Sequence, residues 1–104
     1  MATSFKVQSV AQLAKHIRTL SRITESVVFT THALQRMRLR LRRVLDAEVY
    51  DCLRRGKIML PPEEDMKTGN LVCRMVCYGS SRNLAVCVAL EDADPSLIVV
   101  TVLV

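Results

Sequence analysis

The chain has 104 residues, half of them apolar and four of them aromatic, which is enough sequence for one domain (residues 1–104) with a core of aliphatic residues, Met and Cys. Of its fifteen Lys and Arg residues eleven are Arg, and the net charge of +5 favours a nucleic acid or an acidic protein as partner. No window holds the roughly 18 apolar residues of a membrane span, and the first residues lack the pattern of a secretory signal, so we expect a cytoplasmic protein with reduced cysteines and no membrane partner.

The first 22 residues predict an amphipathic helix. Apolar residues recur at steps of three and four, at Val7, Val10, Leu13, Ala14, Ile17 and Leu20. Ser4 or Ser9 can cap its start. Residues 26–30 follow as a short strand, because β-branched and aromatic residues favour a pleated surface.

A second helix is expected from Thr31 to Arg43. On helical spacing one side carries a stripe of His32, Arg36 and Arg40, and another side carries Leu34, Met37 and Leu41. The pattern predicts a helix that packs through its apolar side and presents an imidazole and guanidinium groups to solvent.

A third helix is expected from Asp46, a plausible N-cap, to Arg55, with Gly56 just past its end. Its expected buried residues are Val49, Cys52 and Leu53. A short strand at residues 57–60 and a loop at residues 61–70 follow it.

Residues 71–78 and 84–90 predict a hairpin around residues 79–82. With an even-numbered turn, one face of this hairpin is free of charge and consists of Leu71, Cys73, Met75, Cys77, Leu84, Val86, Val88 and Leu90. The opposite, mixed face collects Val72, Arg74, Val76, Tyr78, Asn83, Ala85, Cys87 and Ala89. The last strand, residues 96–104, is apolar at nearly every position, which is typical of a central strand covered on both faces. We therefore expect partial cover for the mixed face, with the opening helix as the candidate.

These residues resemble the DUF4258 family, which is grouped with the RelE/ParE-type toxin superfamily. The resemblance is carried by Thr31-His32-Ala33, Arg36-Met37, Glu48-Val49, Arg54, Gly56-Lys57-Ile58, Pro61-Pro62, Arg74, Leu84-Ala85-Val86 and Ile98-Val99-Val100-Thr101-Val102. It covers residues 26–104 and leaves the opening helix (1–22) outside. It implies an α+β fold with N-terminal helices packed on an antiparallel β-meander. Where the family has a glycine-containing turn, this chain has residues 42–45, so the second helix can stop, kink or continue to Leu45; in the last case Arg43 joins the stripe.

Two candidate sites follow. An RNA-cleaving toxin needs a group that moves the 2′-hydroxyl proton and cations that stabilise the phosphorane, roles that His32 and Arg36 can fill. Alternatively, His32 caps or buttresses the helix start and the arginines form a solvated face. The resemblance also implies basic and aromatic residues on the exposed sheet face, here Arg74 with Tyr78 and Arg82; the alternative is ordinary cross-strand pairing.

No cofactor or metal site is predicted. The three glycines stand at turns rather than in a phosphate-binding loop, and Cys87 is expected on the opposite face from Cys73 and Cys77, so three thiolates cannot converge on zinc. Buried thiols are the simplest interpretation, with a Cys-His site of Cys52 or Cys87 and His32 as the alternative. The acidic runs at residues 63–65 and 91–94 are interpreted as solvated loops.

The leading hypothesis is thus a RelE/ParE-like domain of toxin–antitoxin type that acts on RNA and, if catalytic, is a metal-independent endoribonuclease. Its catalytic candidates are His32, Arg36 and Arg74, and its binding candidates are Arg40, Arg43, Tyr78 and Arg82. The rival hypothesis is a non-catalytic domain that binds an acidic, antitoxin-like protein through its basic helix or sheet face. The mixed sheet face also suits a homodimer.

Overall fold

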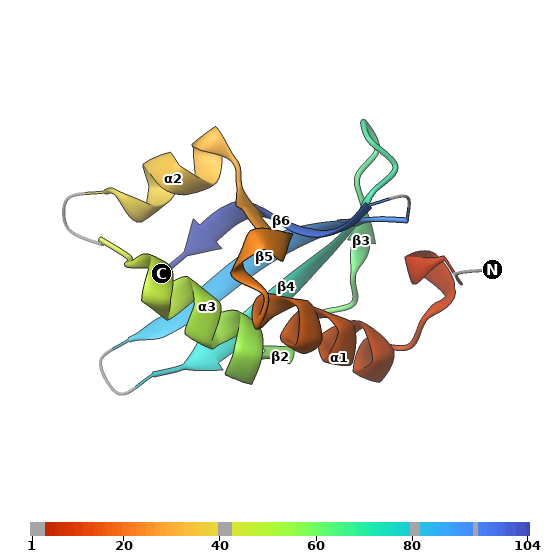
Figure 1. Cartoon of the computed structure of the whole chain (residues 1–104), viewed down its shortest axis with the longest axis horizontal. Helices are drawn as coiled ribbons and strands as arrows, with labels where there is room; N and C mark the ends of the chain where they lie inside the picture. The colour runs from red at the N-terminus through yellow and green to blue at the C-terminus, as the bar shows by residue number, and fades with distance from the viewer. Residues whose placement is uncertain (1–3, 40–42, 80–81, 93) are drawn as a thin grey trace.

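The chain folds as an α+β domain in which most of the strands follow the helices along the sequence (Figure 1). The structure, a computed structural model, describes residues 4–39, 43–79, 82–92 and 94–104. Within these ranges the helices are α1 (Val10–Ser21), α2 (Thr31–Met37) and α3 (Asp46–Arg55), and short 3-10 turns, η1 (Phe5–Val7) and η2 (Thr24–Ser26), precede and follow α1. The strands are β1 (Val27–Phe29), β2 (Lys57–Ile58), β3 (Glu63–Glu64), β4 (Leu71–Tyr78), β5 (Asn83–Glu91) and β6 (Asp94–Leu103).

The strands form one mixed sheet in the order β1-β6-β5-β4-β2, with β3 also paired to β4. Strands β4, β5 and β6 make the expected antiparallel meander. Strand β1, whose pairing the sequence did not predict, joins this sheet parallel to β6, so the sheet is mixed. A parallel pair needs a long crossover connection, and here the whole chain from α2 to β5 supplies it. Strand β3 lies within the segment that was expected to be a loop.

The predicted hairpin register is confirmed. Leu71 pairs with Leu90 at one end of the β4–β5 ladder and Tyr78 pairs with Asn83 at the other. Directly paired residues of antiparallel strands point to the same face. The apolar face and the mixed face therefore have the predicted members.

Helix α1 begins as predicted at Ser9, whose hydroxyl accepts from the Gln12 N–H while the Gln12 side chain accepts from the Ser9 N–H. Leu13 and Ile17 are buried in the core. Val7 falls outside the helix, in η1, and is 73% exposed. Helix α1 packs beside α3 on the apolar face of the sheet (Figure 1), so the expectation that it covers the mixed face is wrong. Leu13 and Ile17 of α1 join Val49, Cys52 and Leu53 of α3 in the same core.

Helix α3 spans the predicted residues, with Asp46 as its first helical residue rather than its N-cap. Val49, Cys52 and Leu53 are fully buried, as expected. Glycine is required after it, because a Cβ at Gly56 would stand 2.5 Å from the carbonyl oxygen of Cys52 and 2.9 Å from that of Val76. This close approach holds the end of α3 against β4.

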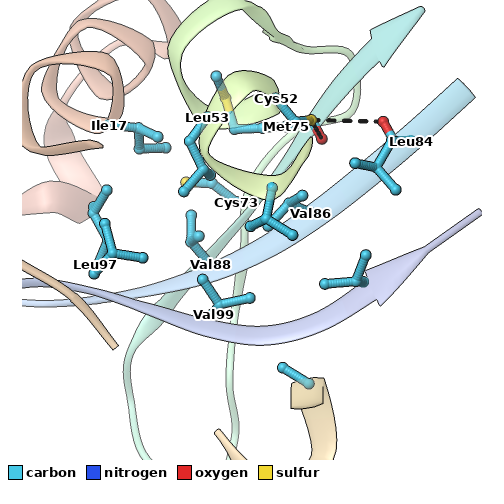
Figure 2. Packing of buried hydrophobic residues seen from close by; sticks show 14 of the residues in the cluster. Ile17, Cys52, Leu53, Cys73, Met75, Leu84, Val86, Val88, Leu97 and Val99 are labelled. Atoms are coloured by element: carbon cyan, nitrogen blue, oxygen red, sulfur yellow. Dashed lines mark hydrogen bonds between the residues drawn. The ribbon is translucent and has the colours of Figure 1, made fainter. Parts of the chain in front are cut away.

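The core lies between the helices and the apolar face of the sheet (Figure 2). Ile17, Leu53 and Met75 bring α1, α3 and β4 together there, and none of them is exposed. The Cys52 thiol lies 3.3 Å from the Met75 carbonyl and 3.7 Å from the Leu84 carbonyl. This thiol behaves as a small core residue that reaches backbone acceptors of two strands.

The mixed face carries no helix among the described residues. Strand β6 is an inner strand, as expected, between β1 and β5. It is covered on one face only, since Leu97, Val99 and Val102 are buried while the side chains of the other face are half-buried, namely Ile98, Val100, Thr101 and Leu103. A register shift between Cys87 and Val88 inserts Val100 as an extra residue of β6 on this side. Cover for both faces, inferred from the apolar run, is thus not present within the described chain.

Candidate nucleic-acid and partner-binding surfaces

Thr30 fixes the start of α2. Its hydroxyl accepts from the Ala33 N–H at 3.1 Å and lies 3.0 Å from the Val99 carbonyl and 3.2 Å from the Val100 carbonyl. Its own N–H also bonds the Val99 carbonyl. Thr30 therefore caps α2 and ties it to the irregular part of β6, a role we had considered for His32. A threonine just before the helical pattern was the signal for this cap.

His32 and Arg36 lie one turn apart on α2. His32 is exposed and Arg36 is half-buried, and among the described residues neither makes a hydrogen bond or an ion pair. The alternative in which His32 caps the start of α2 is wrong, because Thr30 is the N-cap residue. The side chains of Ala33 and Met37 are buried below them, so α2 presents its polar side to solvent.

Helix α2 is shorter than the sequence pattern predicts. It ends at Met37, with Arg38 as its exposed C-cap residue. The chain then returns so that the Val44 N–H bonds the Met37 carbonyl at 2.8 Å, and Val44 is buried. The prediction of a helix to Arg43 is wrong, and Arg43 does not extend the helical stripe. Arg40 and Leu41 lie outside the described residues.

Arg82 is held in an ion pair. Its Nη2 donates to Glu48 Oε1 at 2.7 Å and its Nε donates to Oε2 at 3.1 Å, while Nη2 also reaches the Arg43 carbonyl. The Arg82 hydrogen bond, followed by the Leu45 N–H, lowers the pKa of the Glu48 carboxyl. This arrangement anchors the β4–β5 turn to the first turn of α3, so we do not count Arg82 among the free cations.

Arg74 stands on the mixed face of the sheet. It pairs with Cys87 across the ladder, it is exposed, and no ion pair or hydrogen bond engages it within the described chain. It borders a depression of about 80 Å³ whose other wall includes Leu60, Pro61 and Glu63. Arg74 is therefore an unpaired guanidinium in mainly apolar surroundings.

The structure does not bring Arg74 to His32 and Arg36. Helix α2 packs against β6, and β5 separates β6 from β4. Neighbouring strands lie about 4.8 Å apart, so Arg74 lies roughly 10 Å across the sheet from the strand under α2. The candidate residues thus divide into two sets: His32 and Arg36, which with Arg38 form a basic α2 surface, and Arg74 on a separate sheet surface.

A larger cleft, of about 670 Å³, opens between α3 and the end of β4, and sequence reasoning missed it. Tyr78, which is 69% exposed, lines it together with Cys77 and Lys57. Its remaining charges are largely neutralised by each other, since Glu48 holds Arg82 and Asp51 lies 3.6 Å from Arg55. Because it depends on contacts between α3 and the sheet, no local sequence signal marks it.

The cysteines do not form a reactive or metal-binding set. Burial raises the pKa of the Cys73 thiol to about 11, and burial is also the main cause that raises the pKa of Cys52. The structure does not bring a thiol to His32. His32 is exposed whereas Cys52 is fully buried, and Cys87 pairs with Arg74 on β4. Within the described ranges no three His, Cys, Asp or Glu side chains are grouped to hold a metal ion. In the same part of the chain, every helix is too short or too polar to cross a bilayer.

The fold and these surfaces define a small basic α+β domain with one sheet face left open. The model of a family described as "Domain of unknown function (DUF4258)" matches residues 29–104, and the chain belongs to this family. Curated proteins and solved structures yield no match.

Proposed function

We propose that this protein is a RelE/ParE-like domain of toxin–antitoxin type that acts on RNA through the basic α2 surface. The observation that carries the proposal is the set of uncompensated cations on and after α2. Between Glu25 and Asp46 the sequence has five arginines, one histidine and no acidic residue. Within the described chain the side chains of His32, Arg36 and Arg38 have no bonding partner, so they are available to phosphate oxygens.

The proposed reaction is attack of a ribose 2′-hydroxyl on the adjacent phosphate. The 2′-oxygen forms a bond to phosphorus, the bond from phosphorus to the 5′-oxygen breaks, and the leaving oxygen takes up a proton from water. His32 would accept the 2′-hydroxyl proton, and Arg36, one helical turn away, would stabilise the negative charge on the phosphorane. This chemistry needs no metal ion. Arg74 is left out of this step because two strand spacings separate it from β6.

RNA binding is tested with a labelled single-stranded RNA by fluorescence anisotropy at several salt concentrations. The affinity should fall with salt, and each phosphate contact that is lost should reduce the logarithmic slope by about 0.7. Arg36→Ala and Arg38→Ala should each weaken binding and reduce this slope. Arg55→Ala, which removes an exposed arginine of α3, is the matched control and should change neither. Equal effects of all three substitutions would contradict the assignment of the α2 surface.

Catalysis is tested separately, on the same RNA, by looking for products with a 2′,3′-cyclic phosphate. His32→Ala should abolish cleavage while leaving binding nearly intact, and expression of the wild-type chain, but not of this variant, should arrest growth. Cleavage that survives His32→Ala would refute the role given to His32.

A second candidate is a non-catalytic domain that binds an acidic protein through the same cations. The observation in its favour is that Arg74 does not join His32 and Arg36, so the described residues assemble no larger catalytic set. RNA binding without cleavage and without growth arrest, together with displacement of RNA by an acidic protein, would favour it.

A further inference from the structure

The open sheet face is a second surface with a different chemistry from α2. Its apolar side chains are Val28, Val72, Val76, Ala85, Cys87, Ala89, Ile98, Val100 and Leu103, and its polar and charged ones include Arg74, Tyr78, Asn83 and Thr101, with Lys57 of β2 and Glu63 of β3 at the edge. Val28 is 47% exposed, and Ile98, Val100 and Leu103 are half-buried. Cys87 and Ala89 of the middle strand are only 7% exposed, so the accessible apolar atoms belong mainly to β1, β6 and to Val72 and Val76 of β4. Exposed apolar residues that gather on one sheet face are candidates for an interaction site.

The positive charge of Arg74 requires a negatively charged group on a partner that covers this face. Arg74 pairs with Cys87 of the middle strand, and a second cation that the register places on this face, Lys57, pairs with Val76 from the edge strand β2. Glu63 lines the same depression but makes no ion pair with Arg74. A partner that covers the apolar residues will take Arg74 out of water, and this is favourable only if it supplies a carboxylate.

The same charge argues against other occupants. A second copy of this chain presents an arginine at the same place and again carries a net charge of +5, so self-association gathers like charges. RNA offers phosphates at every nucleotide, whereas this face offers the Arg74 guanidinium, with the Lys57 ammonium at its edge, among mainly apolar side chains, which suits a protein better.

We propose that the open sheet face binds an amphipathic helix of a partner protein, with one carboxylate of its apolar side placed on Arg74. The opposite face of the same sheet already binds α1 and α3 through aliphatic side chains, and burial of a sheet face under helices is the usual arrangement in α+β domains. This surface is independent of the α2 cations, and the proposal holds whether or not RNA is the substrate.

The experiment uses the full chain and three designed helical peptides with a leucine-rich apolar side. They differ only at the centre of that side, which carries Glu, Gln or Lys. Calorimetry should show that the Glu peptide binds about tenfold or more tightly than the Gln peptide, and that the Lys peptide binds weakest. Arg74→Glu should reverse the order of the Glu and Lys peptides. Arg55→Glu, a charge reversal on α3, should leave the order unchanged.

Amide chemical shifts decide where the peptide lies. Changes should concentrate at Val72, Cys87 and Thr101 and spare α1 and α3. Equal binding of the three peptides, no binding at about 1 mM peptide, or shifts confined to α3 would overturn the proposal. So would a dimer of the free chain that Arg74→Glu dissociates, or RNA-induced shifts at the same amides, because they would assign the face to a second copy or to RNA. Arg36→Ala should leave peptide binding unchanged even where it weakens RNA binding, because the two proposals concern different surfaces.

Discussion

Removal of the Glu48 carboxylate should destabilise the protein by about 2 kcal/mol, through two separate losses. The carboxylate accepts from the Leu45 N–H at 3.0 Å at the start of α3, and loss of such a helix-start contact costs about 1 kcal/mol. It also holds Arg82 through two guanidinium nitrogens, and because both side chains are about 30% exposed (28% and 32%), we assign the pair about 1 kcal/mol. For a domain of this length the sum lowers the melting temperature by roughly 10 °C.

The assay is urea unfolding of wild type, Glu48→Ala, Arg82→Ala and the double variant. The double-mutant cycle should give a coupling energy of about 1 kcal/mol between Glu48 and Arg82. The Lys6–Glu64 pair is the matched comparison, since its side chains are more exposed, at 44% and 53%, and its coupling should stay below about 0.5 kcal/mol. Equal coupling in the two pairs would refute the argument that the bidentate geometry and partial burial of Arg82 matter.

The pH dependence gives an independent check. The pKa of Glu48 is lowered in the folded protein, so its contribution is complete above the ordinary value of 4.5 and is lost as the pH falls through the folded-state pKa. The stability difference between wild type and Glu48→Gln should therefore shrink in acid. A constant difference from neutral pH to strong acid would mean that the charge of Glu48 does not contribute.

Three further perturbations test the packing around the sheet. Gly56→Ala should cost roughly 1–3 kcal/mol in urea unfolding, because the new Cβ meets the carbonyl oxygens of Cys52 and Val76 at 2.5 and 2.9 Å. Ile17→Ala should cost about 2–5 kcal/mol, since the side chain is fully buried, and a cost below 1 kcal/mol would show that α1 is not part of the core. Burial lowers the pKa of His16, so stability should fall as the pH drops below its ordinary value of 6.5 and level off once the folded protein also binds the proton; His16→Gln should remove this dependence.

The strand register was the part of the fold that the sequence predicted best. The elements that cover each face of the sheet were the part that it predicted least well. Alternation with a period of two fixes which residues share a face, and Leu71 accordingly pairs with Leu90. Nothing in that alternation says what covers a face. An apolar run such as residues 96–104 is equally compatible with burial under a helix and with a surface that awaits a partner, and this is why the placement of the opening helix was wrong.

The second helix shows how tertiary contacts override a local pattern. Arg, Leu and Met are good helix formers, and their spacing continues past Met37. Helix α2 instead ends at Met37, and the buried Val44 donates its N–H to the Met37 carbonyl, a contact that a continuous helix through Arg43 does not contain. The types of residue in the candidate site could be read from the sequence. Their separation could not, because it depends on strand order, which places β5 between Arg74 and the strand under α2.

The family model matches residues 29–104, a segment that contains both proposed binding surfaces but not helix α1. Helix α1 lies outside that segment, yet Leu13 and Ile17 belong to the core, so this chain uses α1 to close the helical face of its sheet. The basic α2 surface, and every residue of the open sheet face except Val28, lie inside it. The two proposed binding surfaces thus lie within the segment that the family model matches, whereas α1, which lies before it, contributes to the stability of this chain by closing the core over Leu53 and Leu97.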